Sequence, residues 1–260
     1  MWRLTCIFSV VVMSAVAALA QDAPPLLPAT SPSTQPFVVD NLPADSPIRA
    51  WFTELASPDA AVRDKAQTQL MGISRNELGG LRELISDNRP LATAQIAALH
   101  DIVTHVFLAT ETYPLAPDGK SFLGVRWQPA DNFSSGPLSL GVTVEERLPG
   151  FPGFQLLREG DMIMGVIISP DTPMEQLRPT PDPISLQGAV GNAPPNQSIL
   201  LLVLRQGQRM RIALKLAPKP ADLSRDPGDP IIENFLAGRL QRAEQFWQDQ
   251  FAPLLRQSVS

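Results

Sequence analysis

SFLGV, at residues 121–125, opens the segment of the chain that decides the fold. Apolar and polar residues alternate over residues 140–148 and 209–216, which predicts two half-buried strands. The apolar runs 162–168 and 199–204 predict two further strands, the second of them covered on both faces. The RQGQ sequence that follows the second run predicts a hairpin turn into the last strand.

A short helix is predicted between these strands. It runs from Leu186 to Val190, with Ser185 as its N-cap and Gly191 as its C-terminal stop. Residues 170–183, which precede it, are rich in proline and predict an irregular insertion.

The order of these elements resembles a bacterial PDZ domain of the circularly permuted kind found in exported trypsin-like proteases (HtrA/Deg type). The residues that carry the likeness are SFLGV at 121–125, GVTVEERLPG at 141–150, LLREGDMIMGV at 156–166 and ILLLVLRQGQ at 199–208. The chain departs from the family pattern at residues 155–157, where Gln-Leu-Leu replaces Ala-Gly-Leu. The resemblance implies an α+β fold in which residues 114–220 form a partly open antiparallel β-barrel with a short helix.

Such a domain binds a peptide as an added strand beside a free sheet edge, and amide N–H groups of a tight loop hold the terminal carboxylate. Gly124 points to this loop, because glycine tolerates positive φ and lets the backbone approach the carboxylate closely. The alternative is that Gly124 only begins a strand and Phe122 belongs to the core. The predicted peptide-binding residues are Lys120, Phe122, Leu123, Gly124, Val125, Leu186, Ala189 and Val190.

Residues 45–113 show helical periodicity and predict a small N-terminal bundle of four helices. Asn76 is predicted to cap the third helix, and the fourth is predicted to end around Tyr113-Pro114. The sequence LASPDAAVRDKAQTQLMGIS, residues 55–74, has a weak resemblance to a HEAT-like repeat. The likeness covers about one repeat and a half, and about three are needed to close a solenoid, so we expect a bundle.

The last part of the chain, residues 221–260, begins as a polar, proline-rich linker and ends in a long amphipathic helix. Its apolar face repeats at helical spacing from Ile231 to Leu255. Two roles stay open for this helix. Either it packs on the N-terminal helices, or it is an interface for a partner or a homo-oligomer, with Trp247 and Phe251 as suitable anchors.

Residues 1–20 predict a signal peptide, because Arg3 precedes an apolar core and an Ala-x-Ala cleavage site. The apolar run of roughly 13 residues is short against the ~20 that span a bilayer, so no membrane span is predicted in the mature chain. Residues 21–44, rich in Pro, Ala, Ser and Thr, predict a semi-extended tether. Cys6, the one cysteine, lies within the signal, which leaves no disulfide. The predicted location is periplasmic or extracellular.

Composition and motifs exclude several classes of function. A formal net charge of −5 gives no basic field for a phosphate backbone, so no nucleic-acid partner is predicted. The only histidines, His100 and His105, are five residues apart on a predicted helix and point to different faces, which suits neither a shared metal nor a catalytic triad. Asp161, after Gly160, is predicted to cap backbone N–H groups of a turn. No P-loop or dinucleotide motif is present, and no cofactor is predicted.

The sequence therefore predicts an exported, non-catalytic adaptor that binds an extended or C-terminal peptide of another exported protein. The alternative is a structural or assembly subunit, in which the PDZ-like fold is a packing module and the C-terminal helix makes the contacts. A hydrolase with an unfamiliar site is the third hypothesis.

Overall fold

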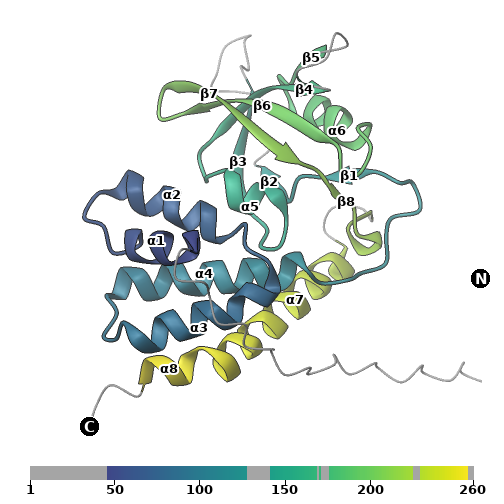
Figure 1. The fold of residues 1–260 in the computed structure, drawn as a ribbon. Coiled ribbons are helices and arrows are strands. Elements are labelled where there is room, and N and C mark those ends of the chain that lie inside the picture. Colours follow the sequence, from purple (N-terminus) through teal and green to yellow (C-terminus); the bar gives the residue numbers. More distant parts are fainter. Residues whose placement is uncertain (1–45, 128–140, 169, 171–175, 225–228, 257–260) are drawn as a thin grey trace, which may run out of the picture. The chain divides into compact units, whose positions relative to one another are not determined.

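The computed structural model describes residues 46–127, 141–168, 170, 176–224 and 229–256 (Figure 1). The predicted signal peptide, the predicted tether and Leu140 lie outside the described residues. Within them the fold is α+β, as predicted, with antiparallel sheets that do not close into a barrel and a helical C-terminal segment. None of the described helices is both long enough and apolar enough to cross a membrane.

The four predicted N-terminal helices are present, and a short 3-10 helix precedes the third. Their bounds are α1 Pro47–Glu54, α2 Ala60–Leu70, η1 Arg75–Glu77, α3 Leu78–Asp87 and α4 Thr93–Ala109. The predicted end of α4 around Tyr113-Pro114 was wrong. The hydroxyl of Thr110 donates to the carbonyl of Phe107 at 3.0 Å and closes the last turn, so the helix ends at Ala109.

The predicted cap of the third helix was also wrong, because Asn76 lies inside η1 and not before it. The carboxylate of Glu77 accepts from the backbone N–H of Ser74 at 2.7 Å and from its hydroxyl at 2.8 Å. The S-x-x-E spacing of a capping box therefore sets this helix start, in place of the Asn preference for the N-cap.

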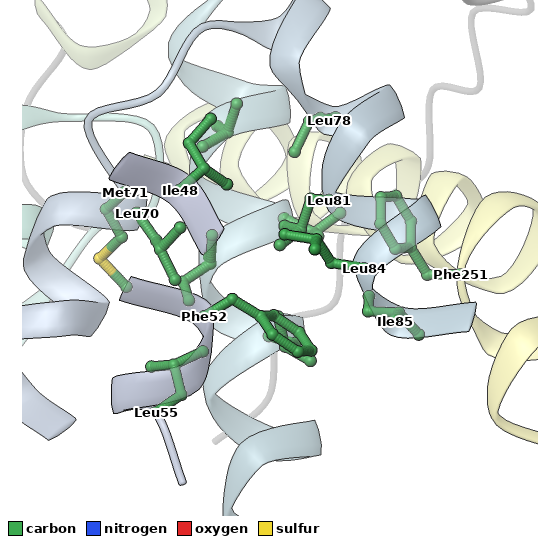
Figure 2. Packing of buried hydrophobic residues seen from close by; sticks show 14 of the residues in the cluster. Ile48, Phe52, Leu55, Leu70, Met71, Leu78, Leu81, Leu84, Ile85 and Phe251 are labelled. Carbon is green, nitrogen blue, oxygen red and sulfur yellow. The ribbon is translucent and has the colours of Figure 1, made fainter. Parts of the chain in front are cut away.

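The N-terminal helices share one core with the C-terminal segment (Figure 2). That segment consists of α7 Pro230–Gln250 and α8 Ala252–Arg256. Ile48, Phe52 and Leu81 of the N-terminal helices belong to the same buried cluster as Trp247 and Phe251. The last two rings stack with their centroids 5.5 Å apart. This confirms the first predicted role of the C-terminal segment, packing on the N-terminal helices.

A single continuous C-terminal helix was a wrong prediction, since Phe251, at φ −119°, separates α7 from α8. The break lets α8 lie against α3 (Figure 1). Trp247 and Phe251 are 5% and 0% exposed, so these two rings are not available as anchors for a partner. Ile231 and Leu240 remain exposed on α7. A homo-oligomer through Ile231 to Leu255 stays a prediction.

The strands form two antiparallel sheets. Their bounds, with the short helices among them, are β1 Ser121–Phe122, β2 Val125–Trp127, β3 Val142–Arg147, α5 Pro152–Leu156, β4 Met162–Ile168, β5 Gln176–Pro179, α6 Pro183–Gly191, β6 Ser198–Arg205, β7 Gln208–Lys215, β8 Ala217–Pro218 and η2 Ala221–Ser224. The larger sheet has the order β2-β3-β4-β6-β7, with β5 beside β4, and β1 pairs with β8. Gln206 and Gly207, at φ 50° and 80°, form the predicted hairpin turn between β6 and β7.

The four predicted strands correspond to β3, β4, β6 and β7, but β6 is not covered on both faces. Ile199, Leu201 and Val203 are buried in the core, whereas Leu200 and Leu202 on the other face are half-buried. The alternation of buried and half-buried residues along the strand could not be predicted from the apolar run, because leucine occupies both faces.

Around α6 one strand was missed, and the N-cap and the start of the helix were predicted wrongly. The insertion at residues 170–183 contains β5, which pairs with β4. Ser185 is not the N-cap: its N–H and its hydroxyl each donate to Asp182 at 2.8 Å, and Asp182 caps the helix. Pro183, whose fixed φ suits the first helical position, moves the start of α6 ahead of the predicted Leu186.

Candidate functional site

A cavity of about 390 Å³ lies between the β1–β2 segment and α6. Its walls include every predicted peptide-binding residue except Ala189. They are Lys120, Phe122, Leu123, Gly124 and Val125 from the β1–β2 segment, with Leu186 and Val190 from α6. Ala189 is 4% exposed and packs in the core of the larger sheet, so it does not reach the cavity.

Prediction from sequence missed several residues of this wall. Ile184, Gln187, Gly188 and Gly191 line the cavity and fall at i, i+3, i+4 and i+7, the spacing of one helical face. Correct bounds for α6 would have identified them, but the predicted helix began only at Leu186. Four further residues join the wall from outside the predicted motif: Trp127, Asn192, Lys219 and Leu223.

Two carbonyls of the segment from Leu123 to Val125 bond to residues 148–153, and these bonds orient the amide N–H groups of the segment. The carbonyl of Leu123 accepts from the N–H of Gly153 at 2.8 Å, and that of Gly124 accepts from Leu148 at 2.8 Å. In a trans peptide the N–H points opposite to the carbonyl of the same unit. The N–H groups of Gly124 and Val125 therefore point away from residues 148–153, none of which lines the cavity.

Two amides of this segment have no partner among the residues that the structure describes. No oxygen of those residues accepts from the N–H of Leu123 or Gly124. Gly124 has φ +78°, a left-handed conformation that lets successive amides converge on an anion. The predicted carboxylate loop therefore has the backbone geometry of an anion-binding turn.

Strand β2, next to this loop, is the end strand of the larger sheet as the structure describes it. Leu148 donates its N–H to the carbonyl of Gly124, and Val125 pairs next with Arg147. Hydrogen-bonded and non-bonded pairs alternate in an antiparallel ladder, so Val125 directs its N–H and carbonyl outward, away from β3. This edge is open to one added strand.

The charge beside the loop is positive. Lys120 and Lys219 both line the cavity, and the carbonyl of Lys120 accepts from the N–H of Lys219 at 2.9 Å. Asp118 pairs with the ammonium of Lys120 at 3.1 Å, and the hydrogen bond from Lys120 lowers the pKa of that carboxyl. Lys219, which the sequence prediction missed, is thus a second cation near the amides.

A buried hydroxyl fixes the distance between the loop and the helix. Ser121 donates from its side chain to the carbonyl of Ala193 at 2.6 Å, just after the end of α6. The side chain of Ser121 is 4% exposed, so this bond is sheltered from water. This hydrogen bond therefore joins the β1–β2 wall of the cavity to the α6 wall.

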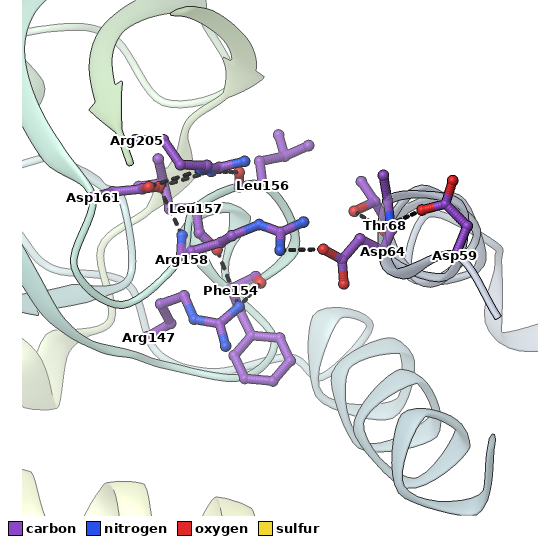
Figure 3. A network of polar contacts seen from close by, with 11 residues as sticks. Asp59, Asp64, Thr68, Arg147, Phe154, Leu156, Leu157, Arg158, Asp161 and Arg205 are labelled. Atoms are coloured by element: carbon purple, nitrogen blue, oxygen red, sulfur yellow. Dashed lines mark hydrogen bonds and ion pairs between the residues drawn. The ribbon is translucent and has the colours of Figure 1, made fainter. Parts of the chain in front are cut away.

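Asp161 lies in a separate cluster that Figure 3 shows, and its predicted role in the turn is confirmed. Its carboxylate accepts from the backbone N–H of Arg158 at 2.8 Å. It also accepts two hydrogen bonds from the guanidinium of Arg205, at 2.8 and 2.7 Å, a partner that sequence alone did not identify. Both oxygens of this carboxylate therefore accept hydrogen bonds from the sheet and its turn, which is a structural role.

The two histidines sit in different environments. His105 is 4% exposed, accepts through Nδ1 from the N–H of Gly150 at 3.1 Å, and stacks on Phe154. Burial, with the nearby charges of Arg239 and Arg147, lowers the pKa of His105 to about 4. His100 is half-exposed and meets Glu244 at 2.8 Å. The carboxylates of Asp101 and Glu244 raise the pKa of His100.

We expect the free energy of unfolding to depend on pH through His105. The unfolded side chain gains a proton below its ordinary pKa of 6.5, while the folded one stays neutral down to about 4. Stability therefore falls as the pH drops through this window, by about 3 kcal/mol. His105→Gln, which keeps an acceptor for Gly150, should remove that part of the pH dependence in urea unfolding measured from pH 7.5 to pH 4.

His100→Gln is the control for this prediction, because folding raises the pKa of His100 and lowers that of His105. The raised pKa of His100 adds stability that is complete below 6.5 and is lost as the pH rises through the folded value. This variant should steepen the loss of stability on acidification. Equal pH profiles for His105→Gln and the unmodified chain would contradict a buried neutral imidazole.

Comparisons with known proteins find only weak similarity to this chain. No family model matches the chain, and no curated protein matches it. Among solved structures, the HtrA-type protease AlgW with a decapeptide is 20% identical at a TM-score of 0.31, over 48% of this chain and 35% of that one. A variant of AlgW, also with a decapeptide, is 19% identical at a TM-score of 0.31, over 52% and 36%.

The PDZ domain of a carboxy-terminal protease from Vibrio cholerae, in complex with a peptide, is 18% identical at a TM-score of 0.28. It covers 38% of this chain and 94% of that domain. This chain spans about a third of the length of the AlgW chains.

Proposed function

We propose that this chain is an exported, non-catalytic adaptor with a PDZ-like domain that binds the C-terminal end of a partner peptide. One observation carries the proposal: the amides of Leu123 and Gly124, which have no acceptor among the described residues, adjoin both the outer edge of β2 and a cavity. Export is inferred from residues 1–20 alone.

The cavity is suited to an added strand. A peptide paired with the outer edge of β2 bonds to the N–H and carbonyl of Val125, and its terminal carboxylate reaches the amides of the loop. Lys120 and Lys219 strengthen this end of the site, since a charge-assisted hydrogen bond is stronger than a neutral one.

The walls favour an apolar peptide end. The cavity walls include four largely buried apolar residues, so the last side chain enters an apolar environment: Leu123, Val125, Leu186 and Val190. Side chains two positions apart on a strand point to the same side, so the third residue from the end also faces α6. There Ile184, which is 82% exposed, offers an uncovered apolar surface.

A library of nonapeptides with free C-terminal carboxylates tests the proposal on the full chain. We expect apolar residues to be selected at the last position and at the third from the end. Amidation of the selected peptide should weaken binding by about tenfold or more, because the loop amides lose their anionic partner. Intact recovery of the peptide, checked by mass spectrometry, is expected for a protein without hydrolase activity.

Ile184→Asp is the matched variant, since this exposed side chain lines the cavity and its replacement should leave folding intact. We expect peptide affinity to fall about tenfold, while Leu177→Asp, at an exposed leucine outside the cavity, leaves it unchanged. A library that selects nothing, or an amidated peptide that binds as well as the free acid, would exclude carboxylate recognition here.

A further inference from the structure

The C-terminal helix α7 reaches the back of the proposed carboxylate loop. A small apolar cluster is centred on three buried residues, Leu148, Phe151 and Leu236, the last of them on α7. Phe122 of the loop segment and Ile232 of α7 pack against the same cluster. The loop that faces the cavity and the last long helix of the chain therefore share one patch of core.

Phe151 is in direct contact with the loop. Its ring lies edge-on to that of Phe122, with centroids 4.9 Å apart. A Cβ atom placed on Gly124 would lie 2.1 Å from the Cβ of Phe151, so backbone and side chain touch there with no space between them. Any displacement of Phe151 must therefore change the position of the loop amides.

Arg239 of α7 holds Phe151 from the other side. Its guanidinium lies 4.5 Å from the centre of the Phe151 ring. The same group donates to the carbonyl of Leu108 at 3.1 Å and to the carboxylate of Glu111 at 2.8 Å, at and just after the end of α4. Arg239 is 2% exposed, which favours both the cation–π contact and the charge-assisted bonds.

Two further contacts join the α7 region to the proposed groove. Glu233 of α7 bonds to Arg126 of β2 at 2.7 Å, next to Val125 on the strand that offers its free edge. Leu223 of η2 lines the cavity and also packs in the shared cluster. Helix α7 thus meets the groove at the loop and at the edge strand, and η2, which packs on α7, meets it at the cavity wall.

We propose that α7 is a positioning element for peptide binding: Arg239, acting through Phe151, holds the amides of Leu123 to Val125 in the geometry that receives a carboxylate. This proposal rests on the proposed function. Peptide affinity and the docking of α7 are then thermodynamically coupled, and each must strengthen the other by the same factor. A partner that displaces or covers α7 would therefore change the peptide affinity of the groove.

Arg239→Met tests the coupling, with Arg242→Met as the matched control. Arg242 bonds to the same Glu111 carboxylate at 2.8 Å but is half-exposed on α7. We expect the Arg239 variant to bind the selected nonapeptide about tenfold more weakly, a typical size for coupling between sites, and the Arg242 variant to bind within about twofold of the unmodified chain. Arg239→Lys, which retains the charge, should recover part of the affinity.

A second readout requires no peptide. The amides of Leu148 and Gly153 donate to the loop carbonyls of Gly124 and Leu123, so their hydrogen exchange should quicken in Arg239→Met and stay unchanged in Arg242→Met. A chain that binds no peptide would refute the proposed function and still report the effect of α7 on the loop. Unchanged exchange and affinity in Arg239→Met, or equal effects of both variants, would overturn the positioning role.

Glu233→Gln serves if Arg239→Met fails to fold, because the Glu233 side chain is 61% exposed and its loss costs little stability. We expect faster exchange at Leu148, which donates to the Gly124 carbonyl, and peptide binding weaker by about threefold, because an exposed ion pair contributes little. In that case exchange and affinity equal to those of the unmodified chain would refute the coupling.

Discussion

Gly124→Ala is expected to abolish peptide binding and to lower the free energy of unfolding by about 2–5 kcal/mol. The φ of +78° costs a residue with a Cβ about 1–2 kcal/mol. The new methyl group would lie 2.1 Å from the Cβ of Phe151, and overpacking of this kind costs about 1–3 kcal/mol more. Relief of the overlap requires the loop to move, so its amides no longer converge on a carboxylate. Urea unfolding and fluorescence titration with the selected nonapeptide measure the two effects.

Gly160→Ala separates backbone conformation from steric overlap. Gly160 has φ +84°, yet an added Cβ would meet nothing within 4 Å. We expect this variant to lose about 1–2 kcal/mol of stability and to keep its peptide affinity. A folded Gly124→Ala protein that binds peptide as tightly as the Gly160 variant would show that the loop is not the carboxylate site.

The helices could be predicted from sequence where apolar spacing and capping residues agreed. Ile48 and Phe52 fall at helical spacing and are buried as expected. The errors occurred where two local signals competed, as between Asn76 and the Ser74–Glu77 capping box. The break at Phe251 does have a local signal, which helical periodicity outweighed in the prediction. Pro253 has no N–H to continue the helix and disfavours helical geometry at the residue before it, and α8 then packs against α3.

The candidate site could be located from the sequence but not completed. A glycine between apolar residues at Leu123-Gly124-Val125 marked the loop, and the family resemblance supplied the facing helix. Lys219 could not be found, since β8 reaches the cavity only through pairing with β1, across a long sequence separation. Ala189 was placed in the wall because an apolar helix shows no clear face when both of its sides are apolar.

Asp161→Asn is expected to destabilise the chain by about 3 kcal/mol, the lower end of the cost of breaking a buried ion pair. Asp161 is 1% exposed, and the asparagine would leave the guanidinium of Arg205 without a counter-charge. Arg205 also donates to the carbonyl of Leu156 at 3.0 Å, so the pair joins the end of β6 to α5 and to the start of β4. Urea unfolding at neutral pH measures the loss, and we expect peptide affinity to be little changed because the pair lies outside the cavity.

Asp64→Asn provides the matched comparison, because it also removes an aspartate from an arginine (Figure 3). Asp64 on α2 and Arg158 before β4 are 39% and 43% exposed at their side chains, so this pair remains in contact with water. We expect a loss of at most about 1 kcal/mol, since solvent screens an exposed pair and its partner can be hydrated again. The contrast isolates burial as the cause, because both variants change one carboxylate to an amide. Equal losses of unfolding free energy from the two variants would mean that burial is not the cause. The contact between α2 and Arg158 would then stabilise the turn at residues 158–161 as much as the buried carboxylate of Asp161 does.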